Sequence, residues 1–174
     1  SRFIETELSL KNFKSKIKLI CIYLPNGNPI DTEKFDYKIK WMKKFNQYIA
    51  ELYKSNSPII IGGDFNVIPT DDDVYSPGNF KNDACAHPKT REQFRHLINL
   101  GFTDVIKNFL EGKGNWTYWG YRGGGWQKGN GLRIDHFLTS PEITDIIRSA
   151  KIDRTPRGWE KASDHTPVIL DIII

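Results

Sequence analysis

A run of three isoleucines that ends in two glycines and two polar residues constrains the fold of this chain more than any other feature. It occupies residues 59–69, with Asp64 and Asn66 directly after the glycines. A short apolar run bounded by glycine predicts a buried strand, and glycine lets the backbone turn sharply where that strand ends. Residues two apart in an extended segment point to the same side, so Asp64 and Asn66 are expected to share one face at the strand's carboxyl end. An ordinary Asx turn is the alternative, because both residue types favour turns.

The segments before this strand predict a mixed α/β domain. Residues 2–8 and 16–24 alternate apolar and polar side chains around a polar turn, which predicts an antiparallel hairpin. Residues 32–54 carry apolar side chains at three- and four-residue steps, which is typical of a helix that packs one face on the core. At 174 residues, with 13% aromatic residues, the chain is predicted to form a single domain over residues 1–174 with a sizeable core.

Further elements are predicted after the central strand. A capping box at residues 90–93 predicts the start of a short helix. Other short elements are expected at residues 103–109, 132–138, 141 onward, 149–154 and 168–174. The three acids at residues 71–73 could hold a metal, but their flexible, polar surroundings favour a solvent-exposed loop.

A segment rich in aromatic residues and glycine, residues 115–126, has two compatible interpretations. Aromatic side chains interleaved with glycine and arginine can stack on bases or wedge into a nucleic-acid groove. The alternative is a strand edge that packs its aromatic rings on the core. The net charge of +4 suits an anionic partner such as nucleic acid.

An acid and a histidine in the last third of the chain are candidates for a pair. Alternation along residues 132–138 places Asp135 on the face opposite an apolar one, where it is either exposed or in need of a partner. His165 follows Asp164 immediately before the closing apolar strand. Each residue alone is explained by a solvent-exposed position, but the two together favour an acid–histidine pair.

Four short motifs, taken in order, resemble one protein family. They are Tyr23-Leu24-Pro25-Asn26-Gly27-Asn28, Gly63-Asp64-Phe65-Asn66, Leu132-Arg133-Ile134-Asp135 and Ser163-Asp164-His165. Together they resemble the exonuclease III family of abasic-site endonucleases, within the endonuclease/exonuclease/phosphatase superfamily. The resemblance covers essentially the whole chain, and residues 116–119 are similar to the family's minor-groove and abasic-pocket segment.

The resemblance implies a catalytic role for five residues. Asp64 resembles the acid that orients or deprotonates the attacking water, and Asn66 the amide that helps to place water and phosphate. Asp135 resembles the acid that holds a catalytic histidine, and His165 resembles that histidine, in contact with the scissile phosphate. Tyr23 resembles a tyrosine that contacts the phosphate.

The resemblance also implies a metal and a substrate surface. Mg²⁺, or Mn²⁺ in its place, would be bound by Asp164, Asp64 and Asn66. Carboxylates, an amide, a histidine and a divalent cation are the groups that phosphodiester hydrolysis requires. The residues expected to contact the substrate are Tyr118, Trp119, Arg122, Trp126 and Leu132.

The implied fold is an α/β sandwich of two sheets flanked by helices, a four-layer αββα arrangement like that of DNase I. The chain resembles the larger, C-terminal part of that fold without its first strands. Family members begin with a strand that carries an asparagine and then a Gln-Glu segment whose glutamate is the main Mg²⁺ ligand. Glu5 and Glu7 lie on a different strand and do not match that glutamate.

The function implied is that of a DNA-repair hydrolase that cuts duplex DNA 5′ to abasic sites and trims 3′ ends. One alternative is an inactive or incomplete DNA-binding remnant, which the missing glutamate favours, and the other is a different phosphodiesterase of the superfamily. A monomer is expected for the complete enzyme. The two cysteines suggest no disulfide framework and no apolar run is long enough for a membrane span, so a cytoplasmic location is expected.

Overall fold

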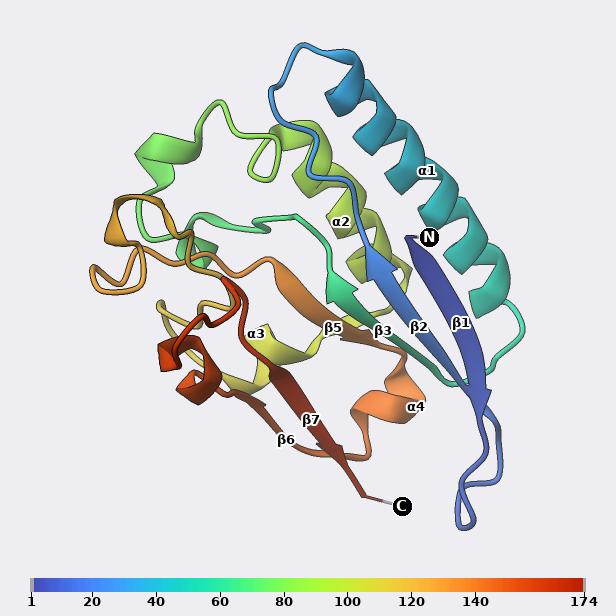
Figure 1. Ribbon diagram of the computed structural model, residues 1–174. Coiled ribbons are helices and arrows are strands. Elements are labelled where there is room, and N and C mark those ends of the chain that lie inside the picture. Colours follow the sequence, from blue (N-terminus) through green and yellow to red (C-terminus); the bar gives the residue numbers. More distant parts are fainter. Residues whose placement is uncertain (1, 174) are drawn as a thin grey trace.

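A five-stranded sheet forms the centre of the computed structural model, which describes residues 2–173 (Figure 1). Its strand order is β1-β2-β3-β5-β4, with β1 and β2 forming the predicted antiparallel hairpin and β2 running parallel to β3. Strand β5 pairs antiparallel with both β3 and β4. The strands are β1 (Phe3–Leu8), β2 (Ile17–Tyr23), β3 (Ile59–Asp64), β4 (Thr103–Asp104) and β5 (Asp135–Thr139).

Two long helices, α1 (Glu33–Tyr53) and α2 (Pro88–Leu100), cover one face of this sheet (Figure 1). The apolar stripe predicted for the first helix is confirmed, because α1 buries residues at three- and four-residue steps. The core between helices and sheet includes Ile20, Ile22, Met42, Phe45, Ile49, Ile59, Ile61, Phe94 and Leu97. Strand β2 therefore buries Ile20 and Ile22 on the helix side.

A second, two-stranded sheet lies on the opposite face of the first (Figure 1). It consists of β6 (Ile147–Ile152) and β7 (Val168–Ile172), and it packs over Ile17 and Ile60 of the large sheet. The short helices α3 (Val105–Phe109) and α4 (Pro141–Thr144) complete this side. The predicted mixed α/β arrangement of two sheets with helices is confirmed. Ile4 is 64% exposed, so within the described residues 2–173 the second sheet leaves part of this face uncovered.

Several element boundaries differ from those predicted. Helix α2 begins at Pro88, before the predicted capping box, because proline is favoured in the first turn of a helix and the His87 ring accepts a hydrogen bond from the backbone of Lys89. Thr90 instead donates its hydroxyl to the carbonyl of Ala84. Strand β5 begins at Asp135, later than the predicted residue 132. Short 3₁₀ turns, all in loops, are η1 (Asp71–Asp73), η2 (Pro77–Phe80), η3 (Arg122–Gly124) and η4 (Thr155–Gly158).

None of the helices within residues 2–173 combines the length and the apolar character required to cross a membrane.

Candidate active site

Three sequence-predicted residues lie side by side where strands β2, β3 and β5 meet. Tyr23 is the register partner of Asp64, and Asp64 is the register partner of Asp135. Directly opposed residues on neighbouring strands place their side chains on the same face of a sheet. The strand pairing thus gathers residues that are far apart in the sequence into one row. Asp64 is at the carboxyl end of its strand, as predicted.

The predicted acid–histidine pair is present in the structure. The Nδ1 atom of His165 lies 2.9 Å and 3.1 Å from the two carboxylate oxygens of Asp135. The loop that carries His165 is fixed by backbone hydrogen bonds on both sides, from Trp119 to Asp164 and from Thr166 to Thr117. Burial disfavours the charged imidazole, but the hydrogen bond and charge of Asp135 outweigh it and raise the pKa of His165.

Asp64 has an unusual pKa for a carboxylic acid. Burial and the neighbouring charge of Asp135 raise the pKa of Asp64 to about 6. The hydrogen bond from the backbone of Asn66 acts in the opposite direction. A carboxylate with a pKa near neutrality can take up a proton under physiological conditions, which is the property required of a general base.

Asn66 contacts Asp64 rather than open solvent. Its backbone N–H donates to Oδ1 of Asp64 at 2.8 Å, and its side-chain Nδ2 donates to Oδ2 at 2.9 Å and to the carbonyl of Leu24 at 3.0 Å. Its Oδ1 accepts from Asn26 at 2.9 Å. An amide nitrogen has two hydrogens, and both are used here. The turn predicted as an alternative is therefore also present, and it orients the acid.

One cavity of about 500 Å³ contains most of the predicted residues. Those that line it are Tyr23, Asp64, Asn66, Tyr118, Arg122, Leu132, Asp164 and His165. The Tyr118 ring packs edge-on against the His165 imidazole, with centroids 4.9 Å apart. Other lining residues, absent from the sequence-based set, include Asn26, Asn28, Tyr75 and Phe80. Tyr75 and Phe80 belong to a stretch that the sequence indicated only as polar loop.

Two predicted substrate-contacting residues do not line this cavity. Trp119 is 1% exposed, so its ring belongs to the core and cannot stack on DNA in this structure. Trp126 packs edge-on against Trp119, with ring centroids 4.9 Å apart. Arg157 donates to the Trp119 carbonyl and lies over the Trp126 ring. Of the two interpretations of the aromatic segment, core packing is thus correct for Trp119, whereas Tyr118 and Arg122 face the cavity.

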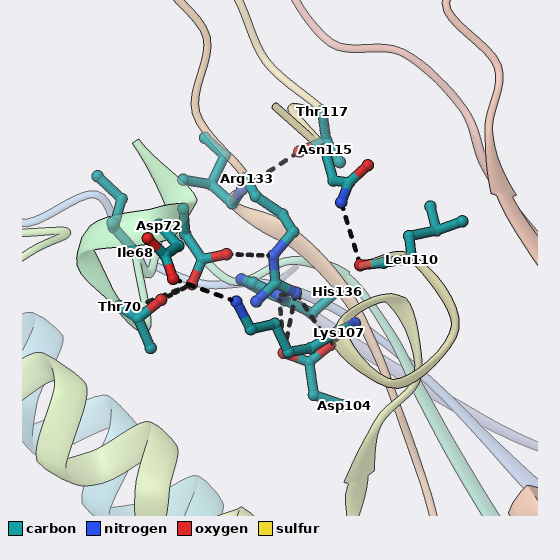
Figure 2. A network of polar contacts seen from close by, with 12 residues as sticks. Ile68, Thr70, Asp72, Asp104, Lys107, Leu110, Asn115, Thr117, Arg133 and His136 are labelled. Atoms are coloured by element: carbon teal, nitrogen blue, oxygen red, sulfur yellow. Dashed lines mark hydrogen bonds and ion pairs between the residues drawn. The ribbon is translucent and has the colours of Figure 1, made fainter. Parts of the chain in front are cut away.

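Behind the site lies a closed polar network that the sequence did not predict (Figure 2). Arg133 is 2% exposed and contacts Asp73 at 2.7 Å, Asp104 at 2.8 Å and the His136 ring at 2.9 Å. The expectation that residues 71–73 form an exposed loop is wrong for Asp73, which is 3% exposed. A buried guanidinium requires acidic partners, and Asp73 supplies one of them.

Residues 2–173 supply an incomplete set of ligands for a divalent cation. No group of three or more histidine, cysteine or acidic residues in that part of the chain is arranged to hold a metal ion. Asp135 is paired with His165, and both carboxylate oxygens of Asp64 accept from Asn66, so these two acids are already engaged in hydrogen bonds. Asp164 also lines the cavity. A divalent cation of the magnesium type requires several oxygen ligands, and these residues alone do not fit it.

Fold and site together place the chain in a known family. Residues 4–165 match the model of the Endonuclease/Exonuclease/phosphatase family, and the chain belongs to that family. It is 34% identical over 152 residues to a DNA-(apurinic or apyrimidinic site) endonuclease of Dictyostelium discoideum, covering 86% of this chain and 41% of that protein. It is 32% identical over 157 residues to an exodeoxyribonuclease of Bacillus subtilis, covering 90% of this chain and 60% of that protein.

A solved structure gives the same result for the fold. A 3′ phosphatase from Neisseria bound to a product DNA hairpin superimposes with a TM-score of 0.87 at 27% identity. The match covers 99% of this chain and 70% of that chain. The chain thus spans about half the length of the curated relatives it matches.

Proposed function

We propose that this chain carries part of the active site of a DNA-repair hydrolase that cleaves phosphodiester bonds 5′ to abasic sites and at 3′ ends of duplex DNA. The observation that carries the proposal is the hydrogen bond between Asp135 and His165, together with the position of His165 and Asp64 in one cavity. The names of the relatives, an abasic-site endonuclease and an exodeoxyribonuclease, support the choice of substrate.

The geometry suggests how the chain's own groups would act. Asp64, with its pKa raised to about 6, would take a proton from the attacking water. The raised pKa of His165 favours the imidazolium, whose Nδ1–H donates to Asp135 and whose Nε2–H is left for a phosphate oxygen. A positive charge at that oxygen stabilises the negative charge that develops as water adds to phosphorus and the bond to the leaving oxygen breaks.

Substrate recognition would come from the aromatic and basic side of the cavity. Tyr118 and Leu132 would contact the abasic sugar, and Arg122 a neighbouring backbone phosphate. Tyr23, 54% exposed beside Asp64, is in a position to contact the scissile phosphate. The net charge of +4 favours approach to a polyanion.

The family resemblance also implies Mg²⁺, with Mn²⁺ as a substitute. Asp164 and Asp64 would contribute two of its oxygen ligands, fewer than such a cation requires. A bound divalent cation would neutralise charge on the phosphate oxygens. The incomplete ligand set favours a second candidate, a chain that binds DNA without cleaving it.

Incision of a duplex with one abasic site in the presence of Mg²⁺ tests the proposal. The 174-residue chain is compared with the same chain joined to the N-terminal part of a relative, and with an Asp64→Asn variant of the joined protein. We expect weak Mg²⁺ binding and little cleavage by the chain alone, and restored cleavage in the joined protein. The Asp64→Asn change should lower turnover by on the order of 10²-fold or more while DNA binding is kept.

Two outcomes would contradict these expectations. A folded joined protein that binds the duplex but does not cut it would favour the DNA-binding candidate. Turnover by the 174-residue chain alone that matches an intact relative would show that its own ligands are sufficient.

A further inference from the structure

Helix α1 buries a lysine directly behind the catalytic acid. Lys38 is 0% exposed, and its Nζ donates to the carbonyl of Asn66 at 2.6 Å and to the carbonyl of Asn26 at 2.9 Å. Lysine is almost never fully buried unless its charge is paired. Here the ammonium group donates to backbone carbonyls of the two loops that border the cavity.

The loop that contains Asn26 is built around the Lys38 side chain. Gly27 has a φ of +86°, and a Cβ atom at that position would lie 2.6 Å from Cδ of Lys38. Glycine tolerates this conformation at little cost. The same loop also contacts Asn66, because Nδ2 of Asn26 donates to Oδ1 of Asn66 at 2.9 Å. Lys38 and Asn26 therefore hold Asn66 from two sides.

Asn66 needs such support, because its backbone is in the left-handed region with a φ of +48°. Residues other than glycine enter that region at an energetic cost. In this conformation its backbone N–H and side-chain amide reach both carboxylate oxygens of Asp64, at 2.8 Å and 2.9 Å. A continuous set of hydrogen bonds thus runs from Lys38 through Asn66 to Asp64.

A purely stabilising role explains this arrangement poorly. Burial lowers the pKa of Lys38, which reflects the cost of removing its charge from water. The charges of Asp83 and Asp64 raise this pKa but offset the effect of burial only in part. Replacing a buried charged group with an apolar residue of similar size is often neutral or stabilising. A methionine at this position would avoid that cost but would donate to neither carbonyl.

We propose that Lys38 is a positioning residue: it holds the Asn66 backbone in its left-handed conformation and thereby orients Asp64. The catalytic consequence rests on the proposed function, but the structural consequence does not. Lys38 does not line the cavity, so it acts through Asn66, directly and by way of the loop that contains Asn26. This assignment predicts a loss of order at Asn66 and Asp64, without unfolding, when the amine is removed.

Nuclear magnetic resonance of the 174-residue chain tests the structural step. In Lys38→Met, exchange of the Asn66 side-chain amide hydrogens with solvent should accelerate by about tenfold or more, because their local protection is lost. Lys38→Arg keeps a charged donor and should retain most of the protection. Lys40→Met, on the exposed side of α1, is the matched control and should leave exchange unchanged. Unchanged exchange in a folded Lys38→Met chain would overturn the proposal.

Kinetics of the cleaving form of the protein test the catalytic step. A misplaced catalytic group can cost on the order of 10²-fold, so Lys38→Met should lower kcat by about that factor and leave KM nearly unchanged. In an Asp64→Asn background the same change should have little further effect, because both act on one group. A rise in KM alone, or a full additional loss in that background, would refute the positioning role. If no form cleaves DNA, the proposed function fails while the exchange experiment still decides the role of Lys38.

If Lys38→Met does not fold, Lys38→Gln provides a second variant that retains an amide donor. Its Asn66 exchange rate should lie between those of the original chain and a donor-free site. An exchange rate equal to that of the original chain would overturn the need for the ammonium group.

Discussion

Two histidine–acid pairs of this molecule, His136 with Asp104 and His165 with Asp135, lie in different environments. His136 and Asp135 are consecutive on β5, yet His136 faces the closed network around Arg133 (Figure 2), whereas Asp135 is hydrogen-bonded to His165, which lines the cavity. His136 is 1% exposed, and its Nδ1 lies 4.0 Å from Asp104. The His165 side chain is 32% exposed, and its Nδ1 lies 2.9 Å from Asp135.

The two environments shift the pKa values of the two histidines in opposite directions. Burial, and then the charge of Arg133, lower the pKa of His136. The Nε2–H of the neutral ring donates to the carbonyl of Val67 at 3.0 Å, which leaves Nδ1 to accept from Arg133. At His165, the hydrogen bond and charge of Asp135 raise the pKa despite partial burial. The pKa of a histidine near an acid therefore depends on the other charges around it: Arg133 is beside His136, whereas Asp135 acts directly on His165.

The largest expected effect tests the pair of Asp135 and His165. Asp135→Asn or His165→Gln in the cleaving form should lower turnover by on the order of 10²–10⁴-fold, and the double variant should lose no more than either single one because the residues act as a unit. A partly exposed pair contributes about 1 kcal/mol or less to the free energy of unfolding. Steady-state kinetics and urea unfolding measure the two effects. A double-variant loss equal to the product of the two single losses would refute the pairing.

The next effect tests the closed network. Arg133→Met leaves Asp73 and Asp104 buried without a cation, which should cost about 3–5 kcal/mol in the free energy of unfolding. Urea denaturation followed by circular dichroism measures it. Arg148→Met, at an exposed position of β6, is the control and should stay within about 0.5 kcal/mol. A loss at Arg133 no larger than that of the control would show that the network is not structural.

The smallest effect compares the pH dependence of stability for the two histidines. His165 has a raised pKa, so its stabilising contribution is present below the unfolded value of 6.5 and is lost as pH rises through the folded pKa. His136 has a lowered pKa, so its contribution is present above 6.5 and is lost as pH falls. The stability deficit of His165→Gln should therefore shrink between about pH 5 and pH 8, and that of His136→Gln should grow.

Urea unfolding at both pH values checks these opposite slopes. His96→Gln is the control, because the His96 side chain is 58% exposed. If both histidine variants show the same sign of pH dependence, the electrostatic contrast between the two pairs is wrong.

Local sequence patterns predicted the main helix, the central strand and the pairing of Asp135 with His165. Periodicity indicates which side of a segment is apolar, and polar residues directly after a buried strand indicate where a site can form. The same patterns misplaced Asp73, whose neighbours in the sequence are polar, and left two interpretations open for Trp119, which the family resemblance placed at the substrate. Both residues are contacted by a distant arginine: Arg133, 60 residues away, donates to the Asp73 carboxylate, and Arg157, 38 residues away, donates to the Trp119 carbonyl.

The sequence by itself determined which residues can do chemistry and which segments form the sheet, because both follow from residue type and short-range spacing. Only the tertiary structure decided which acids became partners of a buried cation, which aromatic rings reached the cavity, and that Lys38 of α1 holds Asn66. Those outcomes depend on contacts between segments distant in the chain, where burial makes an unpaired charge costly and so selects its partners.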